Sequence, residues 1–114
     1  MIERQALENR VVRLLTRKYR IDINKFKTNI SYEKDGCKHE KLKKRIFNWL
    51  IKNDFNVICE ATFKNGGRAD LLVLFPALAI EVLVSETEER FNSKNYPVET
   101  IGVKKLKEVK EKLK

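Results

Sequence analysis

The chain has 114 residues, a formal net charge of +9 and 36% charged residues. This length is enough for one compact domain with a modest core, and no segment approaches the ~20 apolar residues of a membrane-spanning helix. No secretory signal pattern follows Met1, so the sequence predicts a cytoplasmic protein that does not bind membranes. The two cysteines, Cys37 and Cys59, lack metal-binding spacing, which predicts free thiols and argues against a zinc site.

The positive charge is concentrated at both ends of the chain. Residues 1–45 carry a net charge of +8, residues 46–103 carry −3, and residues 104–114 carry +4. This distribution fits a surface that binds a polyanion around a more acidic centre. It also fits a lysine-rich surface that is simply solvated.

The first half of the chain reads as two helices joined by a connector. Apolar residues recur at steps of three and four within residues 1–20, which predicts a helix. Residues 22–37 are mixed and end in the turn signal Asp35-Gly36. A second helix is predicted at 38–53, with an apolar stripe formed by Leu42, Ile46, Trp49 and Leu50.

The second half reads as strands, one short helix and a terminal helix. Strands are predicted at 55–64, 68–75 and 78–84, separated by Asn65-Gly66-Gly67 and by a break at Pro76. A capping pattern at 85–88 predicts a helix over 86–94. A turn at 95–97 then leads to a fourth strand at 98–103 and a basic helix at 104–114. The first three strands can form an antiparallel meander, and a crossover helix lets the fourth strand join in parallel.

These elements predict a mixed α/β fold in one compact domain. Residues 1–37 would supply an N-terminal helix and a connector. Residues 38–103 would form the core, and residues 104–114 a C-terminal basic helix.

Two acidic residues lie inside apolar strands. Asp70 is followed by Leu71-Leu72-Val73-Leu74, and Glu81 stands between Ile80 and Val82. Burying a carboxylate costs several kcal/mol unless a partner or a metal ion compensates it. If Asp70 and Glu81 face each other across neighbouring strands, their oxygens suit a hard cation such as Mg²⁺ or Mn²⁺.

The order helix-strand-strand-strand-helix-strand over residues 38–103 resembles the PD-(D/E)xK nuclease superfamily. Arg68-Ala69-Asp70 resembles the R-x-D segment of its second core strand, and Glu81-Val82-Leu83 stands where its E-x-K segment would be. The resemblance implies a restriction-endonuclease-like fold and a metal-dependent nuclease that hydrolyses DNA phosphodiester bonds. It also implies that Asp70 and Glu81 bind the metal and take part in catalysis.

The resemblance suggests roles for further residues, each with an alternative. Glu60 would be a third catalytic residue, as an additional metal ligand or by holding a metal-bound water, or it would form an ion pair with Arg68 across the hairpin. Arg68 would touch the scissile phosphate, or neutralise the acids. His39 would contact phosphate or a metal-bound water, or be an ordinary surface residue. Phosphate contacts are also expected from the basic residues of the second helix, Lys41, Lys43, Lys44 and Arg45.

One residue departs from the family pattern. The superfamily has a lysine where this chain has Leu83, and leucine can neither activate water nor offset charge on a phosphate. Lys94 and Lys64 are possible relocated lysines, although both are also explained as solvated surface residues.

Three functions therefore remain open. The chain is a metal-dependent nuclease, a catalytically inactive nuclease-fold module that binds nucleic acid, or a structural protein that contacts an acidic partner. DNA is the expected form of the nucleic acid. A homodimer is possible through the helices at 1–20 and 104–114.

Overall fold

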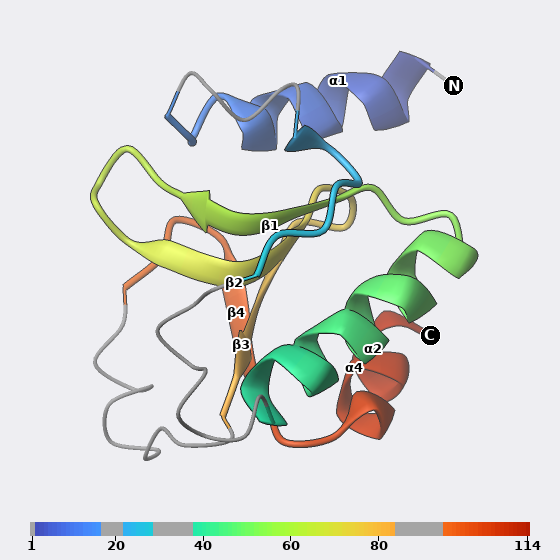
Figure 1. Cartoon of the computed structure of the whole chain (residues 1–114). Coiled ribbons are helices and arrows are strands. Elements are labelled where there is room, and N and C mark those ends of the chain that lie inside the picture. Colours follow the sequence, from blue (N-terminus) through green and yellow to red (C-terminus); the bar gives the residue numbers. More distant parts are fainter. Residues whose placement is uncertain (1, 17–21, 29–37, 84–94) are drawn as a thin grey trace.

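A computed structural model describes residues 2–16, 22–28, 38–83 and 95–114 (Figure 1). Its helices are α1 (Ile2–Val12), α2 (Lys38–Lys52) and α4 (Leu106–Leu113). Its strands are β1 (Val57–Thr62), β2 (Arg68–Val73), β3 (Leu78–Val82) and β4 (Glu99–Val103). The described helices and strands follow the predicted order, with ends that differ by a few residues.

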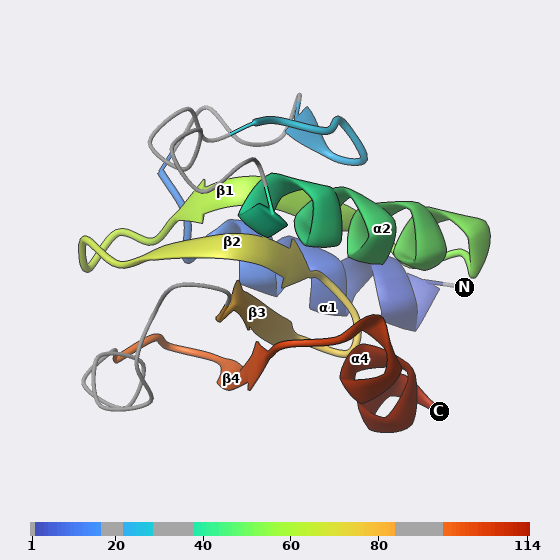
Figure 2. The same ribbon diagram turned by 60° about the horizontal axis from the view of Figure 1, so that its bottom comes forward.

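The four strands form one mixed sheet in the order β1-β2-β3-β4. β1, β2 and β3 pair antiparallel, and β4 lies parallel to β3 at the edge of the sheet (Figure 2). The predicted meander and parallel fourth strand are therefore confirmed. The predicted crossover helix at 86–94, with Lys94, lies outside the described residues.

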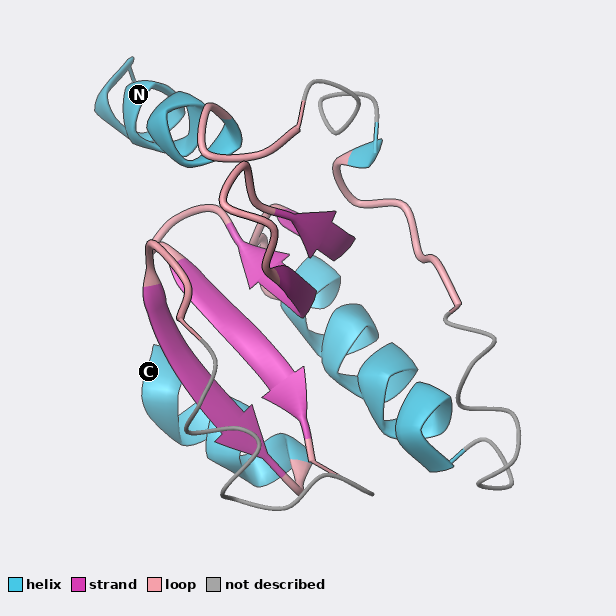
Figure 3. Cartoon of the chain, turned by 90° about the vertical axis from the view of Figure 1, so that its left-hand side faces the viewer, coloured by secondary structure: helices cyan, strands magenta, loops and turns pink. Residues whose placement is uncertain are grey.

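Helices cover both faces of the sheet (Figures 1 and 3). On one face, Val11, Val12 and Leu15 from the α1 segment pack against Ile58, Leu72 and other apolar residues of the strands. On the other face, Ile46, Phe47 and Leu50 of α2 and Val109 of α4 pack against the opposite set of strand residues. The apolar residues of the strands are thus buried on both faces, which confirms the mixed α/β class.

Helix α1 ends earlier than the sequence pattern predicts. The apolar spacing continues to Leu15, but the helix stops at Val12 and Leu15 forms an isolated antiparallel bridge with Phe63. The backbone N–H of Thr16 donates to Thr62 O at 3.1 Å, and that of Lys64 donates to Leu14 O at 2.8 Å. Pairing with the end of β1 therefore replaces the last helical turn, so the helix predicted for residues 13–16 was wrong.

Helix α2 matches its predicted bounds, but its buried face differs from the predicted stripe. Leu42 and Trp49 are only partly buried. Ile46 and Leu50 are buried as predicted, and the other buried side chains are His39, Glu40, Lys43 and Phe47. The first turn and a half of the helix therefore turns charged side chains toward the sheet.

The outer edge of β1 is covered by the connector. Asn24 N–H donates to Val57 O at 2.7 Å, and Val57 N–H donates to the Asn24 side-chain oxygen at 2.9 Å. Asn24 has φ of 63°, a conformation that asparagine tolerates well. Among the helices within the described ranges, none has the length and apolar character needed to cross a membrane.

Candidate functional site

A group of charged and polar side chains links the first half of α2 to the sheet. Lys43 and His39 are fully buried, and Glu40, Asp70 and Glu81 are at most 8% exposed. Such groups are costly to remove from water unless they pair with one another. We refer to this group as the charge cluster, formed by His39, Glu40, Lys43, Glu60, Arg68, Asp70, Glu81 and Tyr96.

Asp70 and Glu81 occupy facing positions where β2 and β3 separate. The pairs Leu71↔Ile80, Leu72↔Ala79 and Val73↔Leu78 set a register in which the next position places Asp70 opposite Glu81. The backbone N–H of Val82 donates to Asp70 Oδ2 at 2.8 Å. The two side chains therefore occupy neighbouring positions on adjacent strands.

His39 connects Asp70 to helix α2. Its Nε2 lies 3.2 Å from Asp70 Oδ2, and its Nδ1 contacts Glu40 Oε2. Both carboxylates are acceptors, so both contacts are hydrogen bonds only if the ring carries a proton on each nitrogen. Burial lowers the pKa of His39, but the hydrogen bonds and charges of Asp70 and Glu40 outweigh it and raise the pKa above its ordinary value. The imidazolium form is therefore favoured in this site.

The same contacts stabilise Asp70 in its ionised form. Burial raises the pKa of Asp70, but the hydrogen bonds from His39 and from Val82 N–H and the charge of His39 outweigh it. The net result is a pKa below the ordinary value for aspartate. Asp70 is thus held as a carboxylate in a mostly apolar environment.

Lys43 is a second buried cation of the cluster. Its ammonium group lies 2.8 Å from Glu60 Oε2 and 3.2 Å from Glu40 Oε1, and it donates to Lys27 O at 2.6 Å. Because this side chain is fully buried, it is not on the exposed basic surface with Lys41, Lys44 and Arg45. The alternative that His39 is an ordinary surface residue is therefore wrong, while the phosphate contacts of His39 and Lys43 stay predictions.

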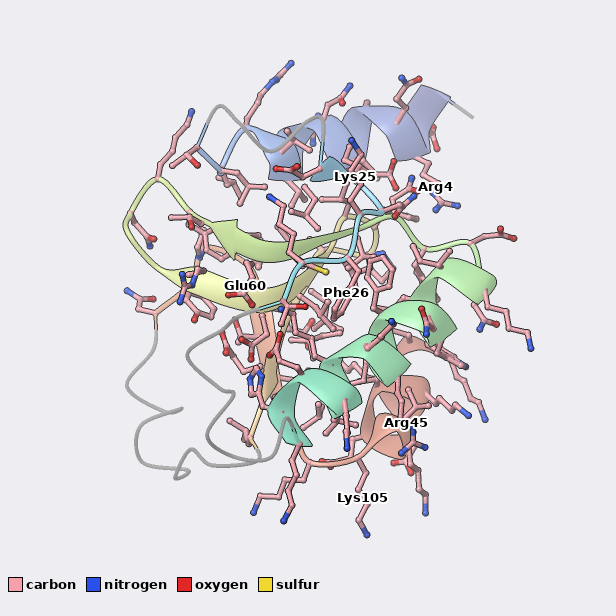
Figure 4. The ribbon with its side chains drawn as sticks, in the orientation of Figure 1. Arg4, Lys25, Phe26, Arg45, Glu60 and Lys105 are labelled. Carbon is pink, nitrogen blue, oxygen red and sulfur yellow. The ribbon has the colours of Figure 1, made fainter. Side chains whose placement is uncertain are left out.

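Glu60 interrupts the regular side-chain alternation of β1. Cys59 packs toward α2 and Ala61 toward α1, while Glu60 reaches Lys43 on the α2 side (Figure 4). This is possible because Glu60 has φ of 53°, a left-handed conformation that costs about 1–3 kcal/mol for a residue other than glycine. Glu60 Oε1 is also 3.5 Å from Arg68 Nε, so the ion pair predicted as an alternative role is present. Arg68 itself remains about half exposed.

Tyr96 holds Glu81 from the other side and was not anticipated from the sequence. Its hydroxyl lies 2.5 Å from Glu81 Oε1 and 2.6 Å from Arg68 O, and its ring stacks near Phe63. A Cβ atom at Gly67 would lie 2.6 Å from the Tyr96 ring, so glycine leaves room for this contact. The sequence shows only a turn at 95–97, which carries no signal for a role in the site.

The substitute lysine that the structure describes does not belong to the cluster. Lys64 is exposed and pairs with none of the described carboxylates, and Lys94 lies outside the described ranges. Leu83 is buried, and its N–H donates to Val103 O at 2.8 Å. Among the described side chains, Lys43 is the one that brings an ammonium group between carboxylates.

The burial of Lys43 had a signal in the sequence. His39, Lys43, Phe47 and Leu50 follow one another at steps of three and four, so they share the face of α2 that packs on the sheet. Glu40 and Lys43 are also one turn apart and can pair. The prediction of one basic surface on this helix did not take that periodicity into account.

The carboxylates of the cluster are candidate ligands for a divalent cation. Within the described parts of the chain, no group of three or more histidine, cysteine or acidic side chains is arranged to hold a metal ion. The Asp70–Glu81 pair offers two carboxylates, and Mg²⁺ is commonly bound by one or two carboxylates with water as the remaining ligands. The donor atoms of this pair therefore suit Mg²⁺ or Mn²⁺.

Comparison of the chain with protein-family models, with curated proteins and with solved structures gives no match. Function is accordingly inferred from the geometry of the charge cluster and from the placement of the exposed cations.

Proposed function

We propose that this chain is a nuclease-like protein that binds nucleic acid, with DNA as the expected form, and acts on phosphodiester bonds with Mg²⁺ or Mn²⁺. The observation that carries this proposal is the Asp70–Glu81 pair. Two carboxyl groups, each at most 7% exposed, face each other at the point where two apolar strands separate. Buried carboxyl groups held close together, one of them with a lowered pKa, are typical of functional sites.

The surrounding residues have defined supporting roles in this proposal. His39 and the Val82 N–H fix Asp70, and Tyr96 fixes Glu81, as outer hydrogen bonds commonly do for metal ligands. A divalent cation at Asp70 and Glu81 would supply charge neutralisation at a phosphate. Arg68 is exposed beside Glu60 and can reach a phosphate from solvent.

Lys43 is the proposed counterpart of the lysine that is missing at Leu83. Its ammonium group comes from α2 and lies between Glu40 and Glu60. In this position it orients Glu60 and balances the excess negative charge of the cluster. Phosphate contacts outside the cluster are assigned to the exposed cations of α2, which are Lys41, Lys44 and Arg45.

Metal binding tests the proposal directly. Calorimetry should detect Mn²⁺ binding to the unmodified protein, and Asp70→Asn should abolish it, because this change removes one ligand charge but keeps a similar shape. Asp54→Asn is the matched control, because Asp54 is exposed and its φ of 64° suits asparagine. Equal Mn²⁺ affinities for the unmodified protein and Asp70→Asn would refute the assignment of the site.

A second candidate function is a nuclease-fold module that binds nucleic acid without cleaving it. The observation that favours it is that the cluster balances its own charges: Lys43 pairs with two carboxylates, and His39 and Tyr96 contact the others. Such a network holds together without a metal ion. This candidate predicts duplex binding in EDTA and no cleavage of a supercoiled plasmid in Mg²⁺ or Mn²⁺, and observed cleavage that Asp70→Asn abolishes would exclude it.

A further inference from the structure

A pocket of about 470 Å³ lies between α2 and the start of α4, apart from the charge cluster. Leu42 and Leu106 supply its apolar lining. Its other lining residues are all cations: Arg45, Lys104, Lys105, Lys107 and Lys110. In Figure 4, Arg45 and Lys105 project from neighbouring parts of these two elements. Five like charges around one pocket repel one another, so the arrangement favours an anionic occupant.

Most of these cations lack an acidic partner. Within the described residues, Lys107 pairs with Glu111 at 3.8 Å, and both side chains are well exposed. Arg45, Lys104, Lys105 and Lys110 form no ion pair with any residue of the described part of the chain. Four charges of one sign are therefore left for a ligand from outside.

The nearby acid Glu108 does not neutralise the pocket through an ion pair. Its carboxylate accepts the backbone N–H groups of Lys104 and Lys105, at 2.8 and 3.0 Å. Glu108 thus caps the start of α4 and fixes the backbone that carries the lysines. Lys104 and Lys105 thus lie in a hydrogen-bonded turn between β4 and α4.

We propose that this pocket binds the phosphate backbone of a nucleic acid, as a second contact surface beside the exposed face of α2. The inference rests on the proposed nucleic-acid function and adds the C-terminal element to it. Arg45 belongs to both surfaces, since it is exposed on α2 and also lines the pocket. A row of evenly spaced phosphates can contact both surfaces at once, and the released counterions contribute to binding.

The test measures the affinity for a 20-base-pair DNA duplex across a range of salt concentrations. Arg45→Ala/Lys105→Ala removes two pocket cations, and Lys104→Ala/Lys107→Ala is a second, independent pocket variant. The matched control is Lys25→Ala/Lys52→Ala, which changes the net charge equally. Both control side chains are exposed and outside the pocket, and Lys25 lies near α1 in Figure 4.

Each pocket variant should lower the slope of log affinity against log salt by up to about 1.8, since each lost phosphate contact removes ~0.9. The control should leave the slope unchanged. If the pocket variants and the control behave alike while the unmodified protein binds DNA, the pocket assignment is wrong and the proposed function stands. If the unmodified protein does not bind DNA, the proposed function itself fails. If polyglutamate at equal charge concentration displaces the duplex, the assignment of the pocket to nucleic acid is wrong and an acidic protein partner is favoured.

Discussion

Lys43 shows how one residue can serve both stability and the candidate site. It is fully buried on α2, and its ammonium group touches Glu40, Glu60 and a backbone carbonyl. Those contacts offset the large cost of taking an ammonium group out of water. They also keep Glu60 in a strained backbone conformation next to Asp70 on the facing strand.

Lys43→Met should destabilise the protein by about 3–5 kcal/mol, because it leaves Glu40 and Glu60 without their buried counterion. Urea unfolding measures the change. Lys41→Met is the control, since Lys41 is exposed on the same helix and its loss should be nearly neutral. Adding Glu60→Gln to Lys43→Met should recover part of the loss. A Lys43→Met protein as stable as the unmodified one would contradict the structural role of this cation.

The His39–Asp70 pair predicts a particular pH dependence of stability in EDTA. In the folded protein the pKa of Asp70 lies below its ordinary value of 3.8. The contribution of Asp70 to stability is therefore lost as the pH falls through the folded pKa. The pKa of His39 is raised from 6.5, so its contribution is present below 6.5 and is lost as the pH rises through the folded pKa. The stabilisation should therefore be largest between these ordinary values, at about pH 4–6.5.

His39→Gln tests this dependence, because glutamine is uncharged at every pH in that range. The difference in unfolding free energy between the unmodified protein and His39→Gln should shrink on both sides of the window. Chemical unfolding in urea from pH 3 to pH 9 supplies the comparison. A difference that does not vary with pH would show that no charge is shared between His39 and Asp70.

At the scale of elements, the sequence correctly predicted the helices and strands that depend on the local spacing of apolar residues. The helix at 38–53 and the order of the strands follow from regular apolar spacing and from the turn at Asn65-Gly66-Gly67, and the structure confirms them. The end of α1 was mispredicted because Leu15 pairs with Phe63, a contact distant in sequence. The position of Asp70 opposite Glu81 was foreseeable, because two antiparallel strands joined by a short turn fix the register.

The rest of the candidate site depends on contacts that no local pattern reports. Tyr96 reaches Glu81 from a turn on the other side of the sheet, and His39 reaches Asp70 from α2. Both contacts arise only when helices and strands pack together. The backbone conformation of Glu60 also has no sequence signal, because glutamate rarely adopts positive φ.

The β1–β2 hairpin gives a prediction at this scale. Gly67→Ala would place a Cβ atom 2.6 Å from the Tyr96 ring, so Tyr96 must move and weaken its contact with Glu81. The expected loss is about 1–3 kcal/mol, as for other overpacked sites. In a Tyr96→Leu background the same change should cost much less, and this coupling is measured by a double-mutant cycle in urea. Equal costs in the two backgrounds would show that Gly67 is not needed to accommodate Tyr96.

Over the whole molecule, a cluster of internally paired charges is separate from the exposed basic surfaces. The charge cluster contains four carboxyl groups and buried or paired cations. The exposed cations of α2 and of the pocket beside α4 lie on neighbouring elements and mostly lack acidic partners in the described chain. Those exposed cations would attract a duplex to the protein, and the charges of the cluster would not have to be neutralised by it.

If the exposed face of α2 and the pocket form one continuous binding surface, their contributions should add. Lys41→Ala/Lys44→Ala should lower the salt slope for duplex binding by up to about 1.8, and combining it with Arg45→Ala/Lys105→Ala should roughly double the decrease. Fluorescence anisotropy at several salt concentrations gives the slopes, with Lys25→Ala/Lys52→Ala as the control for net charge. If the variant with all four substitutions shows no larger decrease in salt slope than either double variant, a bound duplex uses only one of the two surfaces. If the decreases in salt slope add, each surface contacts separate phosphates. The two elements α2 and α4 then lie along the same stretch of nucleic acid.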